Sequence, residues 1–558
     1  MSLEKSELQV VLCDSLEKVL PRAVPRPFDL SVPLVGFAGE TTSFQLAVRG
    51  RSGVEFAGRD RVRLEVTSAT QVVAKVSTVE LMPVEYGGPE NADAGYLVTG
   101  PGLYPDLLTP APDNELIPMI GEWRAVWIDL VISPQCASQE ITVVARVLQG
   151  EHCVTEFSLP MKIIGELLPK LDIPNSQWFH CDGLANFYDL EVFSEQHWTV
   201  IDRFLGAARG VSANTILTPV WTPPLDTGLG QYRTPTQLLR IVERGSDDYE
   251  FDFTELIRWI DMCREHGFQY LEIAHLFTQW GARATPAIYV EIEGHAQRRF
   301  GWDVASTDSS YRAFLEQMIP ALRAVLEQHW GLEGVVFHIS DEPTPENVDG
   351  YALARAAVID LLEGCRIVDA ISDFSLYETG IVPGPIVATD HAERFLEKGV
   401  HPWLYYCVAQ DTGVSNRFIS QHSSVNRVIG AQLFKTKASG FLQWGFNFYN
   451  AARSLRSIDP FRDTCADRTF PGGDAFLVYP GPHGQPLESI RFRVFAEAMN
   501  DLRAMQVVRD RIGTYRVEQI IDPEGGLSLH SFSADPVHYR RVFYQLAQAI
   551  EESLEHPN

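Results

Sequence analysis

The sequence lacks the spacings and runs that mark several large classes of protein. Its eight cysteines form no CxxC pair and no finger-like spacing, which argues against a structural zinc site. No run of about 18 apolar residues occurs, so a membrane-spanning helix is not expected. The N-terminal stretch MSLEKSELQVVLCDSLEKVLP has no apolar core of the signal-peptide type, and a cytoplasmic location is therefore expected.

Basic residues are scarce relative to acidic ones. The chain has 46 Lys and Arg against 73 Asp and Glu, a formal net charge of −27 that is spread along the sequence. This balance argues against nucleic acid and against an anionic membrane as partners, and it favours a neutral substrate. The oligomeric state is not readable from the sequence.

What the sequence does contain is material for more than one domain. Its 558 residues, 45% of them hydrophobic, exceed what one core usually supports. From residue 8 to 165, short alternating segments such as TSFQLAVRG and EWRAVWIDLVI are separated by turn-like clusters. They predict an all-β sandwich domain over residues 1–168.

Beyond residue 168, strand-like runs alternate with amphipathic helical patterns. This α/β alternation predicts a C-terminal (β/α)8 TIM-type barrel over residues 169–515, with a hairpin insertion near 472–482. A helical extension, residues 516–558, is expected to pack on it. A doubly wound sheet is disfavoured because no GxGxxG follows the first strand. The eight strands are expected at 176–182, 213–221, 269–278, 334–342, 365–373, 385–390, 402–408 and 440–449.

The stretch VVFHISDEP places Asp341 and Glu342 side by side at the end of the predicted fourth strand. The acids could simply favour the start of the following helix, but they also crowd two like charges where barrel sites form. An ionised Asp341 would make Glu342 hold its proton more tightly, as a general acid requires. Pro343 ends the strand, which allows both side chains to face one site.

An adjacent pair suits one scheme of sugar hydrolysis better than another. Two carboxyls that flank a sugar about 5 Å apart normally come from different strands. In substrate-assisted hydrolysis the 2-acetamido oxygen of the sugar attacks its own anomeric carbon. Asp341 would orient that amide, and Glu342 would act as acid and then as base.

Three motifs in order carry a family resemblance: HISDEP at 338–343, GFLQWGFNFYN at 440–450 and GGDAFLVYPG at 472–481. Together they resemble glycoside hydrolase family 123, and the preceding β domain matches that family's layout. The resemblance implies a retaining, exo-acting β-N-acetylgalactosaminidase whose catalytic pair is Asp341 and Glu342. It implies as partner a carbohydrate, the terminal amino sugar of a glycan, and no cofactor.

Further residues at the predicted strand ends are candidates for binding the sugar, because aromatic rings stack on its C–H faces and polar groups hold its hydroxyls. Packing in the barrel is the alternative for each. The spacing of His, Asp and Glu matches no ligand template, so no metal is expected. The candidates are His180, Tyr405, Tyr406, Trp444, Asn447, Asp474 and Tyr479.

Two other functions stay open at this point. One is a retaining glycosidase for sugars without an acetamido group, with Glu272 or Glu378 as a separate nucleophile. The other is a carbohydrate-binding protein without turnover. The intact acid pair argues against the second.

Overall fold

The structure of the protein, a computed structural model, describes residues 8–50 and 61–555. The first seven residues, part of the stretch used above to predict location, lie outside these. The chain forms two compact units. The first consists of Met1–Leu171, Thr412–Lys435 and Leu487–Asn558, and the second of Asp172–Asp411 and Thr436–Pro486. Searched across the described residues, the helices include none with the length and apolarity to cross a membrane.

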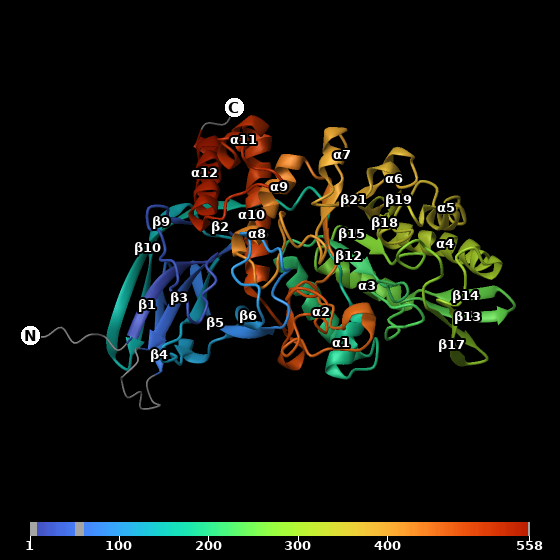
Figure 1. Cartoon of the computed structure of the whole chain (residues 1–558), viewed down its shortest axis with the longest axis horizontal. Coiled ribbons are helices and arrows are strands. Elements are labelled where there is room, and N and C mark those ends of the chain that lie inside the picture. Colours follow the sequence, from blue (N-terminus) through green and yellow to red (C-terminus); the bar gives the residue numbers. More distant parts are fainter. Residues whose placement is uncertain (1–7, 51–60, 556–558) are drawn as a thin grey trace, which may run out of the picture. The chain divides into compact units, whose positions relative to one another are not determined.

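The first unit contains two five-stranded sheets, which confirms the predicted β-rich N-terminal region (Figure 1). Their inner faces share one core, to which Phe44 and Ile128 contribute from one sheet and Val143 and Ile163 from the other. In spatial order one sheet is β1 (Leu8–Asp14), β3 (Thr41–Gly50), β8 (Arg124–Ile132), β5 (Val72–Val84) and β6 (Gly102–Pro110). The other is β2 (Leu34–Ala38), β10 (His152–Leu167), β9 (Gln139–Gln149), β4 (Val62–Thr67) and β7 (Glu115–Leu116).

Helices from the C-terminal part of the chain complete the first unit. They are α8 (Ser423–Arg427), α10 (Ile490–Arg511), α11 (Thr514–Ile521) and α12 (Pro536–Glu555). Ile490, Val494 and Tyr539 join Trp127 of β8 in a second core. Because β8 is covered on both faces, it reads RAVWIDLVI without strict alternation. We expected residues 516–558 to pack on the barrel; the structure groups them with the first unit, where α12 packs against α10 and β2.

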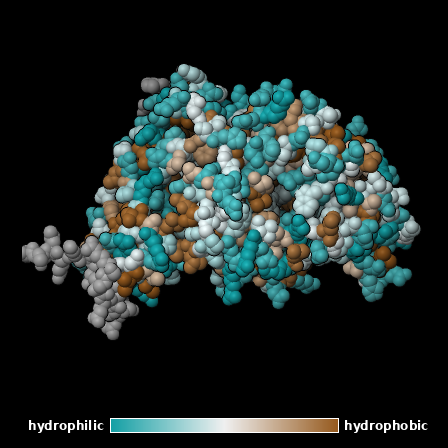
Figure 2. All heavy atoms as spheres, viewed as in Figure 1, coloured by the Kyte–Doolittle hydropathy of each residue, from teal (hydrophilic) through white to brown (hydrophobic). Residues whose placement is uncertain are grey.

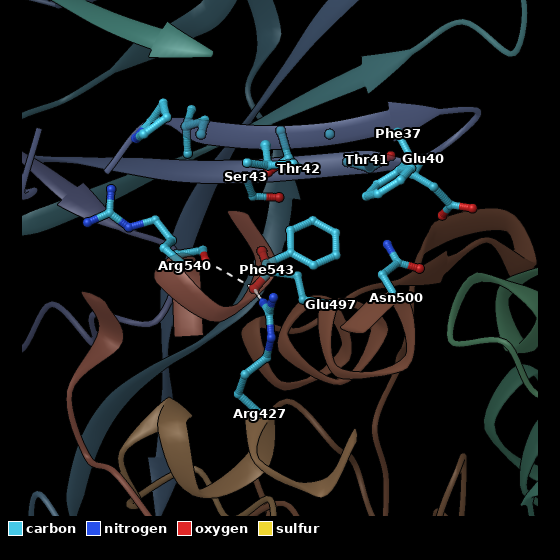
Figure 3. Close-up of a pocket in the computed structure, with 15 residues that line it drawn as sticks. Phe37, Glu40, Thr41, Thr42, Ser43, Arg427, Glu497, Asn500, Arg540 and Phe543 are labelled. Carbon is cyan, nitrogen blue, oxygen red and sulfur yellow. Dashed lines mark hydrogen bonds and ion pairs between the residues drawn. The ribbon is translucent and has the colours of Figure 1, made fainter. Parts of the chain in front are cut away.

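A small cavity of about 40 Å³ lies within the first unit. Figure 3 shows Arg427 and Glu497 pointing toward each other beneath Ser43 of β3. Arg427 also donates from Nε to Asp501 Oδ2 at 2.6 Å, so this buried cation joins α8 to α10. The cavity has room for a few waters and none for a sugar ring.

The second unit is built around a nearly closed parallel barrel of nine strands. Residues Arg366–Ile367 (β19) pair with one neighbour and Asp369–Ile371 (β20) with the other, and only Val368 separates them. Each strand falls at a predicted position. In spatial order they are β19, β18 (Val335–Phe337), β15 (Tyr270–Ile273), β12 (Thr215–Thr218), β11 (Asn175–Gln177), β23 (Gly440–Gln443), β22 (Trp403–Tyr405), β21 (Pro385–Ala388) and β20.

Helices follow most of these strands, as the amphipathic patterns predict. In α4 (Ser309–His329) the buried residues Tyr311, Phe314, Leu315 and Met318 recur at three and four, and Asp308 caps its first turn. The others are α1 (Cys181–Tyr188), α2 (Glu195–Gly210), α3 (Thr254–Glu265), α5 (Val348–Ala356), α6 (Phe374–Glu378) and α7 (Glu393–Glu397). After β22 the chain contributes α8 to the first unit, and α9 (Ile429–Thr436) leads back toward β23.

Two further small sheets lie outside the barrel sheet. A four-stranded sheet contains β13 (Arg240–Gly245), β14 (Asp248–Asp252), β16 (Ile288–Ile292) and β17 (His295–Phe300). A hairpin insertion was predicted near 472–482; in this region Phe476 forms a bridge with Asn447, and a pair of short strands follows. Only β24 (Tyr479–Pro480) is extended there, and it pairs with β25 (Pro486–Leu487).

The surface is mainly hydrophilic on the face that Figure 2 shows, with hydrophobic residues in small groups. Exposed large hydrophobic residues such as Val24, Leu229 and Tyr515 are scattered along the sequence. Such scattering is ordinary for a globular protein.

Candidate active site

The ends of the barrel strands surround a cavity of about 180 Å³. Three carboxyl side chains line it: Asp226, Asp341 and Glu342. Its apolar walls come largely from aromatic rings, which are Trp178, Trp280, Tyr405, Trp444 and Phe470. A cavity with an apolar lining and a few convergent polar groups is the usual form of a small-molecule site.

The acid pair lies beyond the end of β18, and both carboxyls are half-buried in the cavity wall. Successive residues of a regular strand point to opposite faces. Here β18 has already ended at Phe337, and Glu342 has a left-handed backbone with φ of 46°. The carbonyl of Asp341 accepts a hydrogen bond of 2.9 Å from Trp280 N, which holds this turn in place. The irregular backbone is what allows adjacent side chains to share one cavity.

The two carboxyls influence each other's proton. Burial raises the pKa of Asp341 well above its ordinary value, and the neighbouring Glu342 raises it further. Asp341 therefore tends to hold a proton in the free site. Tyr405 donates from Oη to Glu342 Oε1 at 2.7 Å. Burial raises the pKa of Tyr405 well above its ordinary range, so the phenol stays a donor.

A charged network lies inside the barrel beneath the pair. His338 Nε2 and Glu272 Oε1 are 2.7 Å apart, and both side chains are fully buried. Burial by itself would lower the pKa of His338, but Asp369 and Glu272 outweigh it and raise the pKa to about 10. The imidazole is thus a cation at neutral pH, and its charge in turn lowers the pKa of Asp341 against the effect of burial.

Three residues of this region offer ligand atoms close enough to hold a metal ion. His275, His338 and Asp369 have such atoms within 4.8 Å of one another. However, the two imidazole rings stack at 4.3 Å with an interplanar angle of 23°. A metal ion binds in the plane of each ligating ring, and stacked rings do not share such a point. The ring of His338 also holds a proton between two carboxylates, so the geometry fits an imidazolium better than a ligand.

The tryptophans of the cavity are fixed by hydrogen bonds from their indole nitrogens. Trp444 donates to Asp474 Oδ2 at 3.0 Å, and Trp178 donates to Glu272 Oε1 at 2.8 Å. Both rings also line the cavity. Aromatic rings in a cavity wall provide apolar surface on which the C–H groups of a ligand can stack. Asp474 therefore supports the site from behind, since it is fully buried.

His180 and Asn447 lie behind the cavity wall and do not line it. Asn447 accepts from the backbone N of His180 at 2.9 Å and donates to its carbonyl at 3.1 Å. Arg233 donates from Nη2 to His180 Nδ1 at 2.9 Å, so Nε2 carries the proton and donates to Trp444 O. Burial, with Arg233, lowers the pKa of His180 to about 3. Both residues position the segment that holds Trp444.

Tyr406 and Tyr479 also lie away from the cavity. Tyr406 follows Tyr405 in the chain, points to the opposite side and packs on Phe441 with ring centroids 5.2 Å apart. Tyr479 packs on Phe476 and is fully buried. The side chains singled out as sugar contacts thus divide: Tyr405 and Trp444 reach the cavity, and Tyr406 and Tyr479 fill the interior.

Neither predicted separate nucleophile lies in the cavity wall. Glu272 is 0% exposed and accepts hydrogen bonds from Trp178, His338 and Ser176. Glu378 is exposed at the end of α6 and does not line the cavity.

Asp226, Gln279 and Trp280 line the cavity and are not among the residues predicted from the sequence. They lie in the loop segments TPPLDTG and TQWG, several residues after β12 and β15, and only Trp280 has a glycine beside it as a signal. Trp280 is 44% exposed and has φ of 59°. Trp280 thus adds a partly exposed aromatic ring to the cavity wall.

Comparisons with known proteins agree with this geometry. The model of the family described as "Glycoside hydrolase 123, catalytic domain" matches residues 178–508. Among solved structures, a family 123 glycoside hydrolase from Clostridium perfringens has a TM-score of 0.70 and 13% identity, over 98% of each chain. A GH5 xyloglucanase from Bacteroides ovatus has a TM-score of 0.32 and 9% identity, over 84% of this chain and 98% of that one. The curated proteins include no match.

A barrel whose carboxyls and aromatic rings share one cavity, matched by a glycosidase catalytic domain, defines a glycoside hydrolase. Because the matched region spans more than half of the chain, the protein belongs to glycoside hydrolase family 123. It is therefore an enzyme that acts on a carbohydrate, and the alternative of a binding protein without turnover is set aside.

Proposed function

We propose that the enzyme is a retaining, exo-acting β-N-acetylgalactosaminidase that uses the 2-acetamido group of its substrate as the nucleophile. The observation that carries this proposal is that Asp341 and Glu342, adjacent in the chain, line the same cavity. If β19 and β20 are counted as one interrupted strand, the barrel has eight strands and is of the (β/α)8 type. Asp341 and Glu342 then follow its fourth strand.

In the first step the acetamido N–H donates to Asp341, which turns the carbonyl oxygen of the acetamido group toward the anomeric carbon. Glu342 gives a proton to the glycosidic oxygen. The bond from the anomeric carbon to that oxygen breaks, the bond to the acetamido oxygen forms, and an oxazolinium results. Asp341 stabilises its positive charge.

In the second step water attacks the anomeric carbon from the side that the leaving group vacated. Glu342 takes the proton of this water, and the acetamido group is restored. Two inversions at one carbon give net retention. Tyr405 holds the carboxylate of Glu342 in place throughout, because its hydroxyl donates to Oε1.

The raised pKa of Asp341 in the free site is compatible with this order of steps. A hydrogen bond from the substrate's N–H favours the ionised form of Asp341. Binding of an acetamido sugar would then leave the proton for Glu342, where the leaving group needs it. A sugar without this amide supplies no such donor.

The expected substrate is a terminal amino sugar of a glycan. The Clostridium perfringens enzyme, whose fold this chain shares, is described as hydrolysing glycolipid glycans. Glycolipid glycans are therefore the first natural substrates to test.

The proposal is tested with two variants and two leaving groups. Glu342→Ala should slow hydrolysis of 2-acetamido glycosides with poor leaving groups by about 10² to 10⁴-fold, and good leaving groups far less. Asp341→Asn should slow both by about 10² to 10³-fold, because cyclisation itself is impaired. Initial rates on aryl glycosides measure this. Glu346→Gln, exposed five residues after Asp341 in the same segment, is the matched control. Wild-type rates in both variants would reject the proposal.

A retaining enzyme with a separate carboxylate nucleophile makes a different prediction. It would form a covalent glycosyl-enzyme with a 2-deoxy-2-fluoro glycoside, detectable by mass spectrometry. The proposed mechanism requires that no such adduct forms. It also requires that a thiazoline analogue of the hexosamine inhibits as a competitor.

A further inference from the structure

A third carboxyl, Asp226, lines the cavity together with the acid pair. It lies in the segment TPPLDTG between β12 and β13. It takes no part in the mechanism above. Burial raises its pKa to about 6. A side chain that is difficult to ionise, yet placed in the wall of a substrate cavity, calls for a role.

The backbone around Asp226 is held in an unusual conformation. Its φ is 41°, in the left-handed region that glycine favours. Arg453 N donates to Asp226 Oδ2 at 2.8 Å, and Ser454 Oγ donates to Asp226 O at 2.7 Å. Among the described residues, Oδ1 of this carboxyl accepts no such bond, and it is the oxygen left to meet a ligand. Strained backbone held by several bonds is typical of functional positions.

The described part of the cavity wall is acidic. Of the described residues that line it, three carry a carboxyl group and none is Lys, Arg or His. The buried guanidinium of Arg233 lowers the pKa of Asp226 against the larger effect of burial, but it is itself paired with Asp182, with Nε to Oδ2 at 2.8 Å. Arg453 has an exposed side chain and meets Asp226 through its backbone nitrogen. An anionic group on the sugar would therefore meet carboxyl groups in the wall and no basic side chain among the described lining residues.

We propose that Asp226 determines specificity: its Oδ1 accepts hydrogen bonds from hydroxyls of the bound amino sugar, and its charge excludes sugars that carry sulfate on those hydroxyls. The inference deepens the proposed function and rests on it. The substrate class that follows is an unmodified, neutral 2-acetamido sugar. Discrimination of this kind comes as much from repulsion of the wrong ligand as from attraction of the right one.

The test compares aryl 2-acetamido galactosides without sulfate, with 4-sulfate and with 6-sulfate. At pH 7.5 the wild-type enzyme should favour the neutral sugar in kcat/KM by about 100-fold over at least one sulfated form. Asp226→Asn should reduce that ratio to about tenfold or less and raise KM for the neutral sugar, with a smaller effect on kcat. In the wild type the ratio should also fall as the pH drops below 6, and in Asp226→Asn it should not.

Glu293→Gln is the control, because Glu293 is an acidic residue with φ of 51° that is exposed and away from the cavity. An unchanged ratio in Asp226→Asn would overturn the inference. Loss of kcat in Asp226→Asn, together with a covalent sugar trapped on Asp226 of the wild type, would also overturn it, since Asp226 would then be a nucleophile. If no aryl glycoside is cleaved, the proposed function fails. Titration calorimetry with N-acetylgalactosamine and its 6-sulfate then still decides the inference, since preference for the neutral sugar must disappear in Asp226→Asn.

Discussion

The hydrogen bond between Tyr405 and Glu342 can be removed by substituting a single residue. Tyr405 is buried in the wall and donates to Glu342 at 2.7 Å. Tyr405→Phe keeps the ring and removes this donor, so the carboxyl of Glu342 loses one fixed contact. We expect kcat/KM to fall about tenfold while the melting temperature changes by a few degrees at most. Kinetics on an aryl 2-acetamido glycoside and thermal unfolding measure both.

The neighbouring tyrosine provides the control for this experiment. Tyr406 packs on Phe441 and does not line the cavity, so Tyr406→Phe should leave kcat/KM within about twofold. Equal losses of activity in the two variants would mean that Tyr405 acts through packing and that its hydroxyl has no role at Glu342.

Two helices of the first unit, α9 (as far as Lys435) and α10, approach each other closely. A Cβ built on Gly430 of α9 would lie 2.1 Å from the carbonyl oxygen of Ala498 in α10. Backbone atoms cannot move aside as a flexible side chain would. Gly430→Ala should therefore destabilise the protein by about 2 kcal/mol or more, although alanine is the better helix former. Chemical denaturation measures the change.

Gly206 of α2 is the matched comparison. A Cβ there meets only the ring of His266, with Cε1 at 3.4 Å and Nδ1 at 3.7 Å, which are ordinary contacts. Gly206→Ala should be neutral or stabilising by up to about 1 kcal/mol, since only helix propensity changes. If both substitutions are tolerated equally, the close approach of α9 and α10 does not contribute to stability.

For the chain as a whole, the buried imidazolium links stability to pH. The pKa of His338 is about 10 in the folded protein, above the ordinary histidine value. A raised pKa contributes stability that is complete below about pH 6.5 and is lost as the pH rises toward 10. The free energy of unfolding should therefore fall by about 1.4 kcal/mol for each pH unit between 7 and 9 through this group.

His338→Gln removes the titrating group and should flatten this part of the pH profile, whatever its effect at neutral pH. His295→Gln, on an exposed histidine of β17, should leave the slope as it is. Unfolding curves at several pH values provide the comparison. A wild-type profile without any decline in this range would contradict the assignment of a charged His338 between Glu272 and Asp369.

Much of the fold is predictable because the relevant signals are local. Each of the barrel strands lies within or next to a predicted range, since short apolar runs bounded by turns depend on neighbours in sequence. The placement of the C-terminal helices was not predictable in this way. An amphipathic helix shows that it has an apolar face but not which surface will cover it, and α12 covers sheet and helix of the first unit.

The sequence by itself determined the order of strands and helices, the family and the adjacent acids after the fourth strand, because each is written in consecutive residues. Only the tertiary structure decided which side chains meet at the cavity. Closing the barrel brings Asp226, Trp280, Tyr405 and Trp444 to one wall from four distant segments. Which of two neighbours faces inward depends on backbone angles that no pattern specifies, as the left-handed turn at Glu342 shows.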